Sequence, residues 1–329
     1  MTEQRQLIAG GRIFTGDPEK PWAEAAVVEG NCFAFVGSSR EAVSFAGPAA
    51  EKIDCAGELI LPGFVDGHVH VVMTGASLLK AQLRDAVGLE QIQGRIRDWA
   101  FEHRDAPRVL ATGWVQGSLE EGAPTREMLD AVVDDRPVYV DAHDLHSCWV
   151  NSAALRELKI TNSTADPVGG RIVRNADTGE ATGHVDPSIL GNWIEMLGVE
   201  RGQNAMAWPR YIETGATLAL GTDTPTAPFE PIPNMYIAAT RASPSDPSLP
   251  AHRPEWALPL EEAILHGTRE SAYAAWLDHA TGAIKAGLAA DMVVLDRDVF
   301  AEGPKALLET SIRLTMMDGR VTFSAEADA

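Results

Sequence analysis

Cysteine and long apolar runs are both scarce in this 329-residue chain. The three cysteines, Cys32, Cys55 and Cys148, are too few and too widely spaced for a disulfide framework or a cysteine-based metal site, so a reducing, cytoplasmic setting is expected. No run approaches the roughly 18 apolar residues of a membrane span. The first residues lack a basic segment followed by an apolar one, and we therefore expect no signal peptide.

Positive charge is also in short supply. The chain has 27 lysines and arginines against 47 aspartates and glutamates, which gives a formal net charge of −20. This balance argues against nucleic acid or an anionic membrane as a partner, and it suits a neutral or cationic small-molecule substrate. Glycine-rich nucleotide-binding loops and the Gly-x-Ser-x-Gly elbow do not occur in a supporting context, which disfavours those reaction classes.

Both ends of the chain have the pattern of short β-strands. Near the start, turn residues separate apolar segments at 7–13, 25–29 and 32–37. Gly30-Asn31, between two of these segments, and Asp318-Gly319, near the other end, are typical hairpin turns. We predict one small discontinuous β domain formed by residues 1–61 and 281–329. The alternative is two unrelated hairpins packed on the surface.

The middle of the chain, residues 62–280, alternates predicted strands with predicted helices. Strands are expected at 59–65, 108–113 and 137–141, and helices at 125–133 and 151–158. This order is typical of an α/β fold with a parallel sheet, either a (β/α) barrel or an open sheet. Both architectures place chemistry at the carboxyl ends of the strands.

Beyond residue 158 the alternation weakens. Residues 160–190 are expected to form loops, and helical segments are expected at 192–197 and around 208–213. An apolar run at 216–220 predicts one more strand. A longer helix is predicted at 260–276, where acidic residues suit the amino-terminal end of the helix dipole.

Two histidines separated by one residue, His68 and His70, follow shortly after the apolar stretch 59–65. In a strand such side chains share one face, so both imidazoles can grip one metal ion. For 9 histidines in 329 residues, about one quarter of such a pair is expected by chance, and the pair alone is therefore weak evidence.

Asp223 follows the predicted strand 216–220 in a Gly-Thr-Asp-Thr-Pro turn. An aspartate in a turn often serves only backbone hydrogen bonding. Together with His68 and His70, however, it completes a two-imidazole, one-carboxylate set of the kind that binds a catalytic metal and leaves a position for water. Zinc suits these ligands best, and iron and manganese remain alternatives.

Other candidate residues lie after predicted strands. His146 is a substrate-side candidate after the strand at 137–141, whereas nearby His143 is better explained by core packing. Trp114 follows the strand at 108–113 and is either a pocket wall or a packing residue. His184 lies in a predicted loop, and its local sequence assigns it no role.

Four segments resemble signatures of the amidohydrolase superfamily and its YtcJ-like branch. They are 61–70 (Leu-Pro-Gly-Phe-Val-Asp-Gly-His-Val-His), 146–155, 221–225 and 282–296, in the family's order. The resemblance implies a metal-bearing TIM-type (β/α)₈ barrel with a β-sandwich built from both termini. It also implies hydrolysis of an amide or other C–N bond by a metal-activated water.

By position, the resemblance makes His68, His70 and Asp223 ligands of the metal. It makes Asp223 the catalytic proton acceptor as well. It also implies that His146 faces the substrate. Trp114 and His184 are the further candidates for substrate binding.

The sequence also departs from that family pattern. The resemblance implies a carboxylate ligand on strand four and histidines on strands five and six, and nothing between Gly183 and Asp223 matches the two histidines. The barrel is therefore expected to be incomplete, shortened near 183–184. Two interpretations remain. Either one metal is held by His68, His70 and Asp223, helped by His184 or His146, or the chain is catalytically inactive, or active only as a homo-oligomer.

Overall fold

The computed structural model describes residues 4–115, 117–119, 123–167, 170–186, 206–246 and 248–325. The helix predicted at 192–197 lies outside these residues. The chain forms two compact units. The first unit comprises Met1–Val69, Met206–Thr222 and Glu230–Ala329, and the second comprises His70–Ala205 and Asp223–Phe229.

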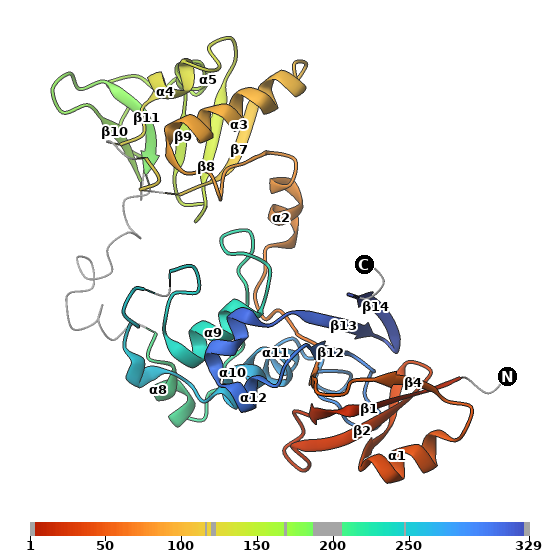
Figure 1. Cartoon of the computed structure of the whole chain (residues 1–329). Coiled ribbons are helices and arrows are strands. Elements are labelled where there is room, and N and C mark those ends of the chain that lie inside the picture. Colours follow the sequence, from red (N-terminus) through yellow and green to blue (C-terminus); the bar gives the residue numbers. More distant parts are fainter. Residues whose placement is uncertain are drawn as a thin grey trace. The chain divides into compact units, whose positions relative to one another are not determined.

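The first unit contains an eight-stranded sheet to which both ends of the chain contribute (Figure 1). The early strands are β1 (Arg5–Phe14), β2 (Trp22–Glu29), β3 (Cys32–Gly37), β4 (Glu51–Asp54) and β5 (Leu59–Pro62). The late strands are β12 (Met292–Leu295), β13 (Ile312–Met317) and β14 (Arg320–Ser324). The strand order is β14-β13-β12-β5-β1-β2-β3, and β4 pairs with β1.

Early and late strands meet where β5 pairs antiparallel with β12. Alternate side chains of these strands point to opposite faces, and both faces are covered. Ile60 and Val294 join one apolar core with Ile8, while Leu61 and Val293 join another core with residues of α9 and α10. Burial on both faces explains why these strands read as continuous apolar runs rather than alternating ones.

Both predicted hairpins are confirmed. Strands β2 and β3 pair antiparallel through Glu29 and Cys32, on either side of Gly30-Asn31. Strands β13 and β14 are joined by Asp318 and Gly319, which have φ values of 51° and 74°. Two consecutive positive φ angles are those of the type I′ turn, whose twist matches paired strands.

Helices and short 3₁₀ segments complete the first unit. They are α1 (Ser39–Ala46), α8 (Trp208–Glu213), α9 (Ile232–Thr240), α10 (Leu260–His266), α11 (Arg269–Ala274), α12 (Val299–Glu302) and the 3₁₀ segments η1 (Pro254–Trp256) and η2 (Pro304–Glu309). Helix α8 confirms the prediction at 208–213.

Two predictions for this unit are wrong. The helix predicted at 260–276 is two helices, because Thr268, with φ −132° and ψ −96°, leaves the helical region between α10 and α11. Residues 216–220 form no strand, because their backbone lacks a ladder partner among the described residues. Only Leu220 makes backbone hydrogen bonds to two other segments: its N–H donates to the carbonyl of His266, and its carbonyl accepts the N–H of Gly67.

The second unit contains a six-stranded sheet in the order β10-β11-β9-β8-β7-β6 (Figure 1). Its strands are β6 (Ala81–Gln82), β7 (Val109–Trp114), β8 (Val138–Ala142), β9 (Cys148–Val150), β10 (Arg171–Arg174) and β11 (Ala181–Asp186). Its helices are α2 (Val71–Ser77), α3 (Gly88–Glu102), α4 (Arg126–Asp130) and α5 (Ser152–Glu157). Ile92 and Ile96 of α3 pack on Val109 and Val140 of the sheet.

The parallel pairing predicted for the middle of the chain is confirmed for β6–β7–β8, whereas β9, β10 and β11 pair antiparallel. The prediction that 160–190 form loops is wrong, because β10 and β11 lie there. The mixed α/β class is confirmed. Among the described residues, no helix is both long enough and apolar enough to cross a bilayer.

Candidate metal centre

The two candidate ligand segments, 66–70 and 220–224, run side by side. The amide of Gly67 donates to the carbonyl of Leu220 at 2.9 Å, and the amide of His70 donates to the carbonyl of Thr224 at 3.0 Å. Neither segment is a strand. The strand predicted at 59–65 ends at Pro62. Beyond Pro62 the chain no longer pairs with β12, because the amide of Val65 donates to the carbonyl of Gly267 instead.

Two glycines allow this close approach. A Cβ atom on Gly221 would lie 2.4 Å from the backbone nitrogen of His68, and one on Gly67 would lie 2.8 Å from the carbonyl oxygen of Leu220. Both distances are too short for a side chain. The glycines beside Asp66 and Thr222 in the two sequence motifs are therefore required by packing at the ligand positions.

A single carboxylate, that of Asp66, ties the segments together. Its Oδ1 accepts the backbone N–H of His68 at 3.2 Å and that of Thr222 at 2.9 Å, and its Oδ2 accepts the Thr222 hydroxyl at 2.6 Å. Hydrogen bonds to a charged acceptor are stronger than neutral ones. The sequence analysis missed this role, although Asp66 lies inside the motif that carries both histidines.

His68, His70 and Asp223 come together in the structure. Their potential ligand atoms all lie within 4.8 Å of one another. Nε2 of His70 is 3.1 Å from Oδ1 of Asp223. Tetrahedral bonds of about 2.0–2.2 Å would place ligand atoms roughly 3.4 Å apart, and the His70–Asp223 separation is close to that value. Two imidazoles and one carboxylate also have the chemistry of ligands for a divalent cation.

The carboxylate of Asp223 is oriented by its own turn. Its Oδ2 accepts the hydroxyl of Thr226 at 2.7 Å, while Oδ1 faces His70. Asp223 has φ 56°, a conformation that non-glycine residues rarely adopt and that occurs at functional sites. The guanidinium of Arg84 donates to the carbonyls of Pro225 and Thr226 and holds the same turn. Thr226 and Arg84 were also missed.

The candidate ligands are open to solvent. The side chain of His70 is 42% exposed, that of Asp223 is 49% exposed, and His68 is exposed as well. A polar contact this exposed contributes little to stability by itself. The arrangement therefore leaves the ligand atoms accessible to water and to a small molecule.

The substrate-side candidates have different surroundings. Trp114 is only 1% exposed and packs against Trp149, with ring centroids 5.8 Å apart. His184 lies edge-on to Trp114 at 5.7 Å, so the structure brings these two candidates together. His146 is exposed, and its backbone N–H donates to Asp144. Trp114 is thus a buried packing residue, which was the second of the two interpretations given for it. A role in substrate binding stays a prediction for all three residues.

Two of the cysteines have unreactive thiols. Burial raises the pKa of Cys55 to about 11. Burial, followed by the nearby charge of Asp141, raises the pKa of Cys148 to about 12. Because the thiolate is the nucleophilic and metal-binding form, neither residue suits those roles at neutral pH.

Comparisons with known proteins point to one family. The model of the amidohydrolase family matches residues 51–190 and 185–323, and thus both candidate ligand segments. The amidohydrolase YtcJ of Bacillus subtilis, itself assigned by inference, is 33% identical over 179 residues, covering 53% of this chain and 33% of that protein. An N-substituted formamide deformylase of Arthrobacter pascens is 31% identical over 193 residues, covering 56% of this chain and 34% of that protein.

The chain therefore spans about a third of the length of these curated relatives. Among solved structures, an uncharacterised metal-dependent hydrolase of Pyrococcus furiosus aligns with a TM-score of 0.57 at 15% identity. That alignment covers 89% of this chain and 99% of the other, and it shows likeness of fold alone. The family model matches most of the length of this chain. The chain therefore belongs to the amidohydrolase family, in the YtcJ-like branch of that family.

Proposed function

We propose that the protein is a metal-dependent hydrolase that cleaves an amide or other non-peptide C–N bond of a small molecule. The observation that carries this proposal is the grouping of His68, His70 and Asp223 on the two segments that match the family. One divalent ion, with zinc as the metal that suits the ligands best, would be held there. Bound there, it would supply an activated water and polarise the substrate carbonyl.

Each residue of the centre has a defined part in this reaction. Nitrogen atoms of His68 and His70 and a carboxylate oxygen of Asp223 would hold the ion. The carboxylate of Asp223 also accepts the proton of the attacking water and returns it to the leaving nitrogen, so that amide and water become acid and amine. The hydroxyl of Thr226, donating to Oδ2, fixes the direction in which that carboxylate faces. Asp66 keeps the backbone of His68 in place.

The substrate is proposed to be a small, neutral or cationic amide. The formamide deformylase relative supports an amide, and the net charge of −20 supports exclusion of anions, nucleic acids and anionic membranes as partners. His146, Trp114 and His184 are proposed to line the substrate side. The proposed setting is the cytoplasm, and a homo-oligomer is the proposed form if one chain alone is inactive.

The architecture belongs to the same proposal. Residues 1–61 and 281–329 would form the β-sandwich of the family, and 62–280 a TIM-type barrel shortened near 183–184. The parallel strands β6, β7 and β8 support the barrel, and the eight-stranded sheet with strands from both chain ends supports the sandwich.

A second candidate function is metal or ligand binding without catalysis. The observation that favours it is the exposure of the ligands, together with the fact that the described residues contain one group only of three or more potential ligands. A protein that retains the ion but cannot enclose a substrate would belong to this class, because catalysis depends on excluding water and positioning the reacting atoms.

A hydrolysis assay separates the two functions. Zinc-loaded wild-type protein and the Asp223→Asn variant would be tested with N-substituted formamides, with amine release as the measurement. We expect turnover by the wild type and a loss of roughly 100-fold or more in the variant, since asparagine cannot accept the proton. Turnover that survives Asp223→Asn would overturn the mechanism, and an inactive wild type that still binds zinc would support the second function.

A further inference from the structure

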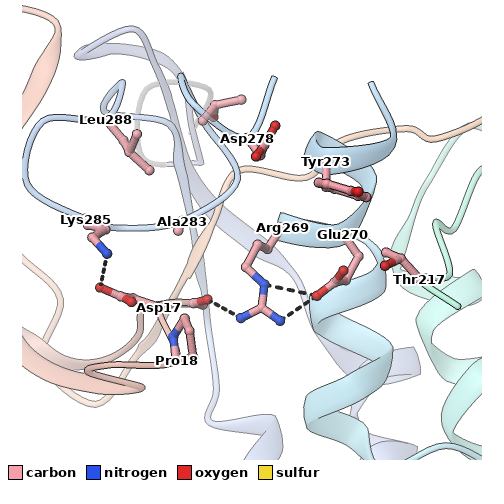
Figure 2. A pocket seen from close by; sticks show the side chains of 12 residues that line it. Asp17, Pro18, Thr217, Arg269, Glu270, Tyr273, Asp278, Ala283, Lys285 and Leu288 are labelled. Atoms are coloured by element: carbon pink, nitrogen blue, oxygen red, sulfur yellow. Dashed lines mark hydrogen bonds and ion pairs between the residues drawn. The ribbon is translucent and has the colours of Figure 1, made fainter. Parts of the chain in front are cut away.

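A cavity of about 360 Å³ lies within the first unit (Figure 2). Its walls come from the turn after β1, from α11 and from the loop that leads to β12. The lining residues include none of the candidate metal ligands or substrate-side residues. Its volume is at the lower end of the range for small-molecule sites, roughly 300–1,000 Å³. The cavity is therefore a separate place where a small ligand could bind.

Both cationic side chains of this cavity are paired with carboxylates that also line it. Nζ of Lys285 is 3.1 Å from Oδ2 of Asp17, and the hydrogen bond to Asp17 raises the pKa of the lysine. Arg269 donates Nε to Oε1 of Glu270 at 3.0 Å and Nη1 to the carbonyl of Gly16 at 2.9 Å. Figure 2 shows both pairs. An anionic ligand would have to compete with these carboxylates for its partners.

A third carboxylate, Asp278, also lines the cavity and is exposed. In the part of the chain that the structure describes, it has no ion-pair partner. The lining thus carries three carboxylates and two cations, with the unmatched negative charge at Asp278. Tyr273 contributes an exposed aromatic ring, and Leu288 contributes apolar surface. A carboxylate near an aromatic ring and apolar surface suits a protonated amine, because the faces of aromatic rings attract cations.

We propose that this cavity binds a small organic cation, a protonated amine with a short apolar body. Asp278 is the ion-pair partner of the ammonium group, and Tyr273 and Leu288 receive the apolar body. The strongly acidic chain adds a field that favours cations over anions. The proposal is independent of hydrolysis and of metal binding.

The test uses benzylamine as the probe, with benzyl alcohol and benzoate as neutral and anionic isosteres. Binding to the full chain is measured by calorimetry or by NMR titration at low salt. We expect benzylamine to bind more tightly than both isosteres, and Asp278→Asn to weaken it roughly three- to five-fold. Glu51→Gln, which removes a negative charge from β4 outside the cavity, should leave the affinity unchanged.

Three results would overturn the proposal. They are equal or tighter binding of benzoate or benzyl alcohol, no effect of Asp278→Asn beyond that of Glu51→Gln, and no detectable benzylamine binding. Because Asp278 is exposed, we expect its variant to fold, and the thermal midpoint of each variant checks this. Tyr273→Ala, also at an exposed position, should weaken benzylamine binding more than it weakens binding of methylamine.

Discussion

Two places in the molecule bring together residues that are far apart in sequence, and they are held in different ways. At the β5–β12 pairing, apolar side chains are buried on both faces of the sheet. At the candidate metal centre, segments 66–70 and 220–224 are joined by glycine contacts, two backbone hydrogen bonds and the carboxylate of Asp66. The two histidines remain exposed, and the side chain of Asp223 is about half exposed.

The difference teaches how stability and binding are divided in this chain. Hydrophobic burial holds the sheet without any need for the metal ligands. A few polar contacts and two positions without side chains determine where the ligands lie. Substitutions in the sheet should therefore lower the free energy of unfolding, whereas substitutions beside the ligands should mainly lower metal affinity.

The largest effect is expected at Leu61, which is 1% exposed in β5. Leu61→Ala should reduce the free energy of unfolding by about 2–5 kcal/mol, because it removes buried methyl groups and leaves a cavity. Denaturant unfolding measures the change. Val321→Ala in β14, where the side chain is 46% exposed, is the control and should change little. Equal losses in both variants would contradict the burial argument.

The next effect is expected at Gly221. Gly221→Ala would place a methyl group 2.4 Å from the nitrogen of His68 and push the two segments apart. We expect zinc affinity to fall by about 100-fold. The control is Gly75→Ala in α2, where a Cβ meets no atom within 4 Å and should stabilise the helix by about 0.5–1 kcal/mol. Unchanged zinc affinity in Gly221→Ala would show that the close contact is not needed.

A smaller effect is expected at Asp66, which positions the ligands without touching the ion. Asp66→Ala should lower zinc affinity about tenfold, and the absorption spectrum of the cobalt-substituted protein should shift as the ligands move. Thr222→Val, which removes only the hydroxyl bond, should do less. Asp66→Asn retains one acceptor oxygen and should restore most of the affinity. A lowered thermal midpoint with an unchanged cobalt spectrum would mean that Asp66 is purely structural.

The smallest effect concerns His266 in the core of the first unit. Burial lowers the pKa of His266, so the folded protein binds its proton less readily than the unfolded chain. Its neutral form favours folding above the ordinary histidine pKa of about 6.5, and this contribution is lost as the pH falls. The stability advantage of wild type over His266→Gln should therefore shrink between pH 7 and pH 5. An advantage that grows toward low pH would contradict this assignment.

The turns and buried strands of the fold could be predicted from sequence. Asp318-Gly319 determines its hairpin locally, and Asn151 caps α5 by accepting the N–H of Ala154. Strands β10 and β11 could not be predicted in this way. The strand β10 reads Arg-Ile-Val-Arg, with one fully buried side chain, so its hydrophobic pattern is weak. The strand predicted at 216–220 is wrong for the opposite reason. The segment is apolar enough for a strand, but a strand also needs a neighbouring strand to pair with, and the sequence does not show whether the fold provides one.

The candidate site was predictable as a set of residues but not as a geometry. The motifs selected His68, His70 and Asp223, and the structure groups them. The expected strand geometry is wrong, because these residues lie on irregular segments. Asp66, Thr226 and Arg84 act through hydrogen bonds that depend on the folded backbone, and no spacing rule identifies such contacts in advance.

The most direct test of the central claim is the metal content of the purified full chain. Wild-type protein and the His68→Ala/His70→Ala double variant would be loaded with zinc, desalted and measured by elemental analysis. Because both histidines are exposed, the double variant should fold, and its circular dichroism spectrum provides the check. We expect about one zinc per wild-type chain and little in the variant. No zinc in either protein, or equal zinc in both, would contradict the proposed centre.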